Sequence, residues 1–554
     1  MERELSSLVL SVFQKTLALA GPTTHDIITQ TVAAVQRCVT ATLAPELRIY
    51  NARLASTACL PDEVLCMIWE LLCVADRVEV SHVCSSWRSL AINTPRLWAE
   101  LDFYSAVHND PCYCSLCTPH MGVTSVQLWN PPSVTNLGIC RNVLARSGCV
   151  PLIVHMEFSL DDTPIREIRR ITASLELHSH RIKSLSFIAQ LPDDVADFFN
   201  EISGLSALPN LRSLHCLAKD TSPRQQQSII LPTLPSVETM IIRMSSLDCT
   251  ALRLPSLRRL HCPVVDENDV RGILDGCPKL ETLILDTKLF RPTSLSDTTL
   301  KSICSRASRL REVVLLDVDR ALEATFLAMF HNADLPRLWI RYDDQHPAPA
   351  RGFIIFYDME ESIDLGLVVS EEAGAEYRIS ATDSSGRCRT VQCLLSSDTM
   401  LAMWGSLSLG SVTTLTLPAH SWSSTIQPDI PILPCVRSAT FLFDERTEYL
   451  LIRVWDRPYP LPGLEHLRIA CSKDLPDRPL VSVAAVAILV TSLRGFTPVD
   501  TLTVTVNNVE LDGDQEGLVS LVRQVQTSPD GFQPQIILEH SCRRNTKLSY
   551  FSAT

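Results

Sequence analysis

Glycine and lysine are scarce in this sequence. Its 554 residues include 18 glycines, and only eight of its 49 basic residues are lysines. So few glycines leave little material for the loops that hold phosphate groups through their backbone N–H groups. The catalytic and nucleotide-binding patterns G-x-x-x-x-G-K-S/T, G-x-G-x-x-G, G-x-S-x-G and H-E-x-x-H are all absent. The sequence therefore offers no catalytic residue and no cofactor site, and an enzyme is the function class with least support.

Positive charge and long apolar runs are lacking too. The net charge of −13 argues against a nucleic-acid partner and against an anionic membrane surface. The longest apolar stretch without a charge, residues 479–493, has 15 residues, fewer than the roughly 20 that span a bilayer. The 20 cysteines are scattered, often where an apolar residue would serve, which is typical of reduced thiols. We therefore expect a cytoplasmic or nuclear protein without a membrane partner.

Apolar patterning at helical spacing opens the chain. Residues 1–58 carry a stripe of aliphatic side chains three and four positions apart, such as Ile28, Val32, Val35 and Val39. Pro45 lies inside the pattern and divides it. We expect a helical N-terminal region, 1–58, that packs against the next segment of the chain and does not form a coiled coil.

Three short helices are predicted between residues 60 and 98. Pro61 suits the first turn of a helix, and Asp76 is a candidate N-cap for a second one. A third passes through Trp87 and ends near Asn93, before Pro95. Because three short helices bury only a small core, apolar surface should remain for a partner.

This segment resembles the F-box, the adaptor-binding module of Skp-cullin-F-box ubiquitin ligases. The resemblance runs through Leu60-Pro61, Glu63-Val64-Leu65, Ile68-Trp69, Leu71-Leu72, Val80, Val83-Cys84, Trp87-Arg88, Leu90-Ala91 and Pro95-Arg96-Leu97-Trp98. It is similar to the expanded F-box families of mushroom-forming fungi, and it implies an F-box domain over residues 59–101. The resemblance implies contact with a Skp-type adaptor through Leu60, Pro61, Val64, Ile68, Val83 and Leu97, with Trp87 and Trp98 in the core.

A cysteine-rich loop, residues 102–121, comes next in the chain. Cys114 and Cys117 have the spacing that lets two thiolates bind one zinc ion, and Cys112 and His120 could complete the set. No second C-x-x-C pair occurs elsewhere in the chain, and a loop of free thiols is the alternative. We therefore predict no metal.

A repeated pattern, apolar-x-x-apolar-x-apolar, occupies residues 122–540. Examples are Leu257-x-x-Leu260-x-Cys262, Leu280-x-x-Leu283-x-Leu285 and Leu310-x-x-Val313-x-Leu315. Many copies follow Leu-Pro or Cys-Pro, and they recur at intervals close to those of leucine-rich repeats. Helical text lies between them at 266–277 and 296–310. The pattern predicts an α/β solenoid, and it resembles an irregular leucine-rich-repeat array.

The repeat rhythm lapses between residues 341 and 412. Four strand-like pieces occur there, and Asp383-Ser384-Ser385-Gly386 is a turn between two of them. We expect hairpins built into the array, with their strands still in its ladder, and no separate domain. The segment 541–554 is polar and is expected to be a C-terminal tail.

The variable positions of the repeats would face a target protein. Among them Arg212, Arg258, Arg259 and Arg468 are candidate substrate-binding residues, because guanidinium groups bind carboxylates and phosphates in a bidentate manner. A solvated strand face of mixed charge is the alternative for each of them.

The F-box resemblance implies a substrate-recognition subunit that reaches a cullin through the adaptor and binds an unknown protein with its repeats. It would have no cofactor and no transfer chemistry of its own. The alternative is a scaffold or regulator that binds the adaptor alone.

Overall fold

The computed structural model divides the chain into two compact units, Met1–Trp98 and Ala99–Thr554, which are described separately. The described residues are 60–72, 74–104, 140–158, 165–189, 198, 208–218, 234–243, 247–291, 297–330, 335–343, 353–359, 361–369, 376–394, 404–418, 432–443, 461–471, 480–494, 502–513, 522 and 524–528, with isolated helical positions between 10 and 34. Most of the predicted N-terminal helical region, the cysteine-rich loop from residue 105 onward and the C-terminal tail lie outside them.

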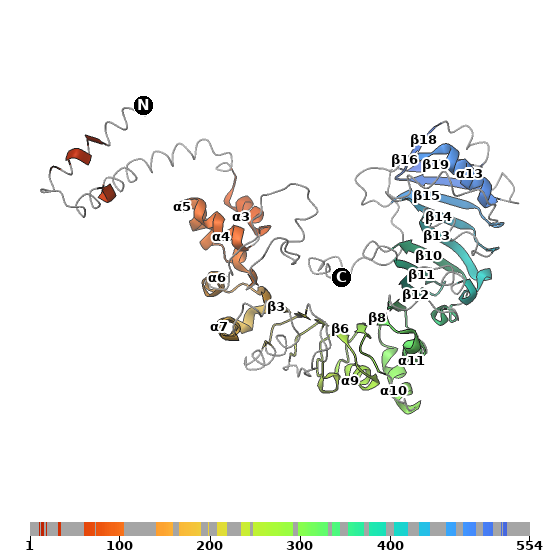
Figure 1. Ribbon diagram of the computed structural model, residues 1–554, viewed down its shortest axis with the longest axis horizontal. Coiled ribbons are helices and arrows are strands. Elements are labelled where there is room, and N and C mark those ends of the chain that lie inside the picture. The colour runs from red at the N-terminus through yellow and green to blue at the C-terminus, as the bar shows by residue number, and fades with distance from the viewer. Residues whose placement is uncertain are drawn as a thin grey trace. The chain divides into compact units, whose positions relative to one another are not determined.

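The first unit contains the three predicted helices (Figure 1), which are α3 (Asp62–Glu70), α4 (Val74–Val83) and α5 (Ser85–Ile92), followed by the 3₁₀ helix η2 (Pro95–Trp98). Pro61 precedes α3 directly, as predicted, because its missing N–H group costs nothing at a helix start. The helix boundary predicted at Asp76 was wrong, because α4 begins at Val74 and Asp76 lies in its first turn. The third helix ends at its C-cap Asn93, as predicted.

Tryptophan and arginine side chains connect these helices. The Trp98 side chain is fully buried, and its Nε1–H group donates to the carbonyl oxygen of Ala91 at 2.7 Å. The rings of Trp69 and Trp87 lie 5.2 Å apart, although Trp87 keeps part of its surface exposed. Buried Arg77 donates to the carbonyl oxygens at the end of α3 and in η2. Small as it is, this unit therefore has a specific core.

The second unit is built on a sheet of 17 strands among the described residues. In chain order they are β1 (Glu100–Tyr104), β2 (Leu152–Phe158), β3 (Ile182–Ala189), β4 (Ser213–Ala218), β5 (Thr239–Arg243), β6 (Arg259–Pro263), β7 (Thr282–Asp286), β8 (Glu312–Val318), β9 (Arg337–Tyr342), β10 (Ile363–Val369), β11 (Glu376–Thr382), β12 (Cys388–Leu394), β13 (Val412–Pro418), β14 (Ser438–Phe443), β15 (His466–Cys471), β17 (Thr503–Asn507) and β19 (Gln524–Ser528). From β1 to β9, and from β13 to β19, each strand pairs in parallel with the next strand of the sheet.

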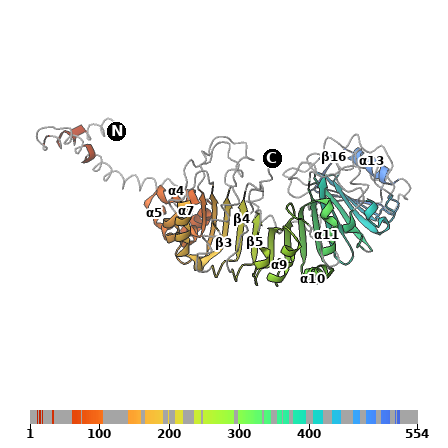
Figure 2. The same cartoon turned by 60° about the horizontal axis from the view of Figure 1, so that its bottom comes forward.

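Most of the helices in this unit lie between consecutive strands. They are α6 (Cys140–Arg146), α7 (Ile165–Glu176), α9 (Glu267–Gly276), α10 (Asp297–Ala307), α11 (Arg320–Phe330) and α13 (Val483–Arg494). In Figure 2, α9, α10 and α11 follow the outer side of the strand array. The helices predicted at 266–277 and 296–310 are thus confirmed as α9 and α10. A separate pair of short strands, β16 (Leu480–Ser482) and β18 (Glu510–Asp512), flanks α13 in sequence.

The predicted strands and their Leu-Pro prefixes form one repeated structure. In each turn of this kind the backbone N–H three residues after the leucine or cysteine bonds back to its carbonyl oxygen, as from Leu257 to Leu254 and from Leu280 to Cys277. Proline fits the second position of such a turn because its φ angle is already close to −65°. The leucines of the L-x-L part then align across the sheet, as Leu260 does with Leu283, and are buried. The opposite side chains of each strand form a second face, which we call the inner face.

The segment between β9 and β13 confirms the predicted hairpins and adds a reversal of strand order. Strand β12 pairs in parallel with β9, β11 is antiparallel to both of its neighbours, and β10 pairs in parallel with β13. The three strands thus enter the sheet in the order opposite to that of the chain. Two reversals of direction restore the original one, so the parallel array continues beyond the insertion.

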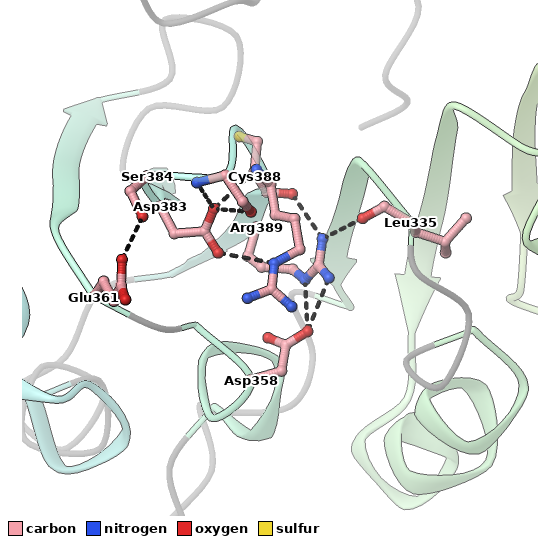
Figure 3. Close-up of polar contacts among 9 residues, drawn as sticks. Leu335, Asp358, Glu361, Asp383, Ser384, Cys388 and Arg389 are labelled. Atoms are coloured by element: carbon pink, nitrogen blue, oxygen red, sulfur yellow. Dashed lines mark hydrogen bonds and ion pairs between the residues drawn. The ribbon is translucent and has the colours of Figure 1, made fainter.

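Two polar groups hold this insertion in place (Figure 3). Asp383 accepts hydrogen bonds from the backbone and side chain of Ser385 and of Arg387, which closes the predicted turn between β11 and β12. The guanidinium group of Arg389 donates to Asp358 at 2.8 Å and to the carbonyl oxygen of Leu335 at 2.8 Å. Arg389 therefore joins β12 to the segment before β9 and to the segment before β10.

Candidate functional site

Apolar side chains on one side of α3 face solvent. Val64, Met67, Ile68 and Leu71 follow one another at spacings of one, three and four residues, and the Leu71 side chain is 87% exposed. The other side of the helix buries Leu65, Cys66 and Trp69 in the core of the unit. Because residues three and four apart share a helix face, the exposed side chains form a continuous apolar patch. We call Val64, Met67, Ile68 and Leu71 the α3 face.

The α3 face includes two of the predicted adaptor contacts, Val64 and Ile68. Leu60 and Pro61 lie immediately before the helix and are exposed, as is Val83 at the end of α4. Leu97 must be removed from the contact set, because its side chain is only 1% exposed and belongs to the core. Its carbonyl oxygen accepts a hydrogen bond from Arg77.

Met67 and Leu71 are surface residues that sequence reasoning did not assign to the contact. The helix is apolar on most of its circumference, so periodicity alone does not separate its buried face from its exposed one. A clue was present, since Leu71 lies three residues after Ile68 and seven after Val64. A single exposed leucine is ordinary in a folded protein, whereas four apolar side chains on one helix face indicate a docking surface.

The inner face of the sheet carries the second candidate site. In register across it lie Ser213, Thr239, Arg259 and Thr282 in one row, and His215, Ile241, His261 and Ile284 in the next. The parallel register places these side chains on one surface because alternate residues of a strand face the same way. The surface is thus polar along one row and partly aliphatic along the next.

The four predicted arginines are not brought together. Arg212 and Arg258 lie just before their strands, where they pair with Glu238 at 3.6 Å and Glu281 at 2.5 Å in the following repeat. Arg311 pairs with Glu281 as well, at 3.4 Å, so these charges form a ladder between repeats. Arg259 and Arg468 lie on the inner face of β6 and β15. Their role in substrate binding stays a prediction.

Residues that sequence reasoning missed surround Arg259 on the inner face. Arg341 of β9 pairs with Asp317 at 2.5 Å, and the guanidinium group of Arg378 on β11 lies 4.6 Å from the ring centre of Trp339. A planar guanidinium over an indole ring is a favourable cation–π arrangement. No sequence signal marks this group, because the reversed order of the insertion is what brings β11 near β9.

Two histidines of this face are buried and neutral at neutral pH. Burial lowers the pKa of His215 to about 4, and the positive charges of His155 and Arg259 lower it further. Burial also lowers the pKa of His261, with further lowering from Arg243, Arg259 and Arg341. Within the described part of the chain, the Nε2 atom of His261 has no hydrogen-bond partner.

The thiols that the structure describes are not metal ligands. Cys249 and Cys262 are buried and hydrogen-bonded to each other, which together with burial raises the pKa of the Cys249 thiol. No group of three or more His, Cys, Asp or Glu side chains among the described residues is arranged to hold a metal ion. The four candidates Cys112, Cys114, Cys117 and His120 lie outside those residues.

Comparison with known proteins bears on the helical segment first. A family model described as F-box-like matches residues 57–104, which contain α3, α4, α5 and η2. Residues 57–104 are an F-box-like domain. The α3 face and Val83 are therefore exposed apolar groups of an F-box-like domain.

Beyond this domain, the human F-box/LRR-repeat protein 12 is 26% identical to this chain, over 46% of the chain and 87% of that protein. A solved structure described as a complex of Rad7 and Elc1 in yeast aligns with 80% of this chain and 96% of that one. Its identity is 9% and its TM-score is 0.23, too low to support any inference about this chain. Neither the F-box-like family nor the human relative points to an enzyme. No helix in the described ranges is long and apolar enough to cross a bilayer.

Proposed function

We propose that this chain is the substrate-recognition subunit of a Skp-cullin-F-box ubiquitin ligase. Its F-box-like domain would bind a Skp-type adaptor through the α3 face together with Leu60, Pro61 and Val83. The single observation that carries the proposal is the α3 face, an exposed apolar patch on the first helix of an F-box-like domain.

The energy available at this patch is enough for a specific complex. Burying one large aliphatic side chain is worth about 1.5–3 kcal/mol, and a few such anchors dominate most protein interfaces. Four of them on one helix face fit the mode in which an amphipathic helix docks into an apolar groove. The acidic Asp62 and Glu63 at the start of α3 add a charged rim to the same surface.

The second unit would hold the target protein. We propose that its strands and helices form an irregular leucine-rich-repeat array, supported by the turn that recurs before so many of its parallel strands and by the likeness to the human F-box/LRR-repeat protein. Its inner face offers polar and charged side chains in register, which suits recognition of a protein surface. The chain itself would transfer nothing and would act by holding the target near the transferring enzyme.

Co-purification distinguishes the ligase from the scaffold alternative. The tagged full chain, expressed together with a Skp-type adaptor and a cullin, is expected to recover both, with the cullin lost when the adaptor is left out. Recovery of the adaptor without the cullin would replace the ligase with the scaffold, and failure to recover the adaptor would contradict the proposal.

A further inference from the structure

Four arginines come together on the inner face around the reversed insertion. They are Arg243 on β5, Arg259 on β6, Arg341 on β9 and Arg378 on β11, and we call them the arginine cluster. All four occupy inner-face positions by register, because Ile241 pairs with His261, Trp339 with Thr390, and Thr390 with Ser380. Arg243, Arg259, Arg341 and Arg378 lie two residues from a member of that row and so face the same way.

The charges of the cluster converge. Arg243, Arg259 and Arg341 all act on the His261 imidazole, although they come from strands as far apart as β5 and β9. Arg341 is held by Asp317, and Arg378 by the face of Trp339. Gln392 of β12 pairs in register with both Arg341 and Arg378, which places those two residues on either side of one strand.

Two carboxylates, Asp286 and Asp317, lie beside the cluster. Asp317 accepts from Arg341, and Asp286 feels the charges of Arg243 and Arg341. Burial raises the pKa of Asp286, and the negative charge of Asp317 raises it further, so Asp286 is a weaker counter-charge than an exposed aspartate. The cluster therefore gathers positive charge on one face of a chain whose net charge is −13.

Two polar atoms at this place lack a hydrogen-bond partner within the described residues. The Nε2 atom of His261 and the indole Nε1–H group of Trp339 are buried without a hydrogen bond. His261 is about 95% buried, since its exposed fraction is 5%. Buried polar atoms without partners cost free energy, so such a group next to a positive cluster indicates a ligand with acceptor oxygens.

We propose that the arginine cluster binds a phosphorylated serine or threonine in a peptide segment of the target protein. The inference rests on the proposed function, because it names what the receptor's inner face recognises. A phosphate monoester carries a charge of about −1.5 to −2 and offers three acceptor oxygens, which suits several guanidinium groups at once. A single carboxylate carries about half that charge and one fewer oxygen. The partly aliphatic row through Ile241 and Ile284 would lie against the peptide's flanking side chains.

The test uses the full chain and three fluorescent peptide pools. The pools share one degenerate sequence and differ only at a fixed central residue, which is phosphoserine, serine or glutamate. Fluorescence polarisation at two salt concentrations gives the affinities. The phosphoserine pool is expected to bind at least about tenfold more tightly than either other pool, and its affinity should fall as salt rises. Equal affinity for the phosphoserine and glutamate pools, or no binding by any pool, would overturn the proposal.

Substitutions locate the binding. Arg243→Gln alone, which changes an exposed side chain, and Arg243→Gln with Arg259→Gln are each expected to weaken binding of the phosphoserine pool, the double variant at least about tenfold. Arg468→Gln is the matched control, because Arg468 lies on the inner face of β15, away from the cluster. An equal loss in the control would overturn the assignment. Thermal unfolding of each variant excludes loss of fold as the cause.

Failure of this inference and failure of the proposed function are distinguishable. Leu71→Asp is expected to abolish adaptor binding while leaving the phosphoserine pool bound. Wild-type chain that binds the pool but no adaptor would contradict the proposed function alone. Wild-type chain that binds the adaptor but no pool would contradict this inference alone.

Discussion

The guanidinium group of Arg389 contacts the carboxylate of Asp358 at 2.8 Å in the interior of the second unit, where Arg389 is almost fully buried. These residues lie on either side of β10 and β11 in the chain, so their ion pair fastens the reversed insertion at its base. The pair and the Leu335 hydrogen bond shown in Figure 3 satisfy a charge that would otherwise be costly to bury.

Breaking this pair should destabilise the second unit strongly. Arg389→Met removes the guanidinium group and leaves Asp358 with an uncompensated charge, which costs about 3–5 kcal/mol. Denaturant unfolding measures the loss. Arg258→Gln is the matched control, because that ion pair is exposed and should contribute no more than about 1 kcal/mol. Similar losses in the two variants would show that burial does not govern the Arg389 pair.

Arg77 should stabilise the F-box-like domain in the same manner. It donates to the carbonyl oxygens of Trp69, Glu70 and Leu97 at 3.2, 2.9 and 2.7 Å. Arg77→Met would leave these acceptors without a partner, at a cost of about 2–4 kcal/mol. Hydrogen exchange of the full chain should then rise within residues 62–98 and not within the second unit. Arg96→Gln, which breaks only the exposed pair with Glu70, is expected to leave exchange there nearly unchanged.

Gly272 inside helix α9 should resist replacement, against the usual helix preference. Alanine is favoured over glycine in helices by about 1 kcal/mol. A Cβ atom at Gly272 would, however, lie 2.5 Å from the carbonyl oxygen of Cys249, in the 3₁₀ helix η6 (Cys249–Ala251). Forcing that overlap costs about 1–3 kcal/mol, so Gly272→Ala should lower the unfolding free energy overall.

Gly405 provides the control for that substitution. It also lies in a helical segment, and a Cβ atom there would meet nothing within 4 Å. Gly405→Ala should therefore leave stability unchanged or raise it by up to about 1 kcal/mol. A Gly272→Ala protein as stable as the Gly405→Ala protein would contradict the close packing of α9 on η6.

His215 should make stability fall as the solution is acidified. Its pKa is lowered to about 4 by burial first and by the charges of His155 and Arg259 next, whereas in the unfolded chain it is near 6.5. Because the unfolded chain takes up the proton first, stability is fully present above pH 6.5 and declines until the pH passes about 4. Between pH 7 and pH 5 this histidine alone should account for about 2 kcal/mol.

Replacing His215 tests that assignment. The His215→Gln variant should lose about 2 kcal/mol less than the wild type between pH 7 and pH 5, in denaturant unfolding at each pH. His82→Gln is the control, because His82 is exposed at the end of α4. If His215→Gln kept the wild-type pH dependence, His215 would not be the neutral buried group that the inner face requires.

Local chemistry made much of the fold predictable. Proline at the second position of the turns before the strands, the alternation of Leu260 and Cys262, and the Asp383 turn each act within a few residues. The features that escaped prediction depend on distant partners. The reversed order of β10, β11 and β12 is determined by pairings across dozens of residues, among them the ion pair of Arg389.

The sites show the same division. The helix that carries the α3 face could be predicted from the spacing of its apolar residues, but which side of it is buried depends on how α4 and η2 pack against it. Leu97 therefore looked like a surface residue, and Leu71 was not recognised as one. Arg212 and Arg258 were recognisable as charged variable positions, whereas their pairing with Glu238 and Glu281 depends on the register of neighbouring repeats.

The most direct test of the central claim is calorimetric titration of the purified full chain with a purified Skp-type adaptor. The wild type should bind, and Leu71→Asp, which places a charge in the middle of the α3 face, should weaken binding at least about 30-fold, equivalent to about 2 kcal/mol. Leu177→Asp is the matched control, an exposed leucine in the second unit, and should bind like the wild type. Wild-type affinity in the Leu71→Asp protein, or no binding by the wild type, would contradict the account.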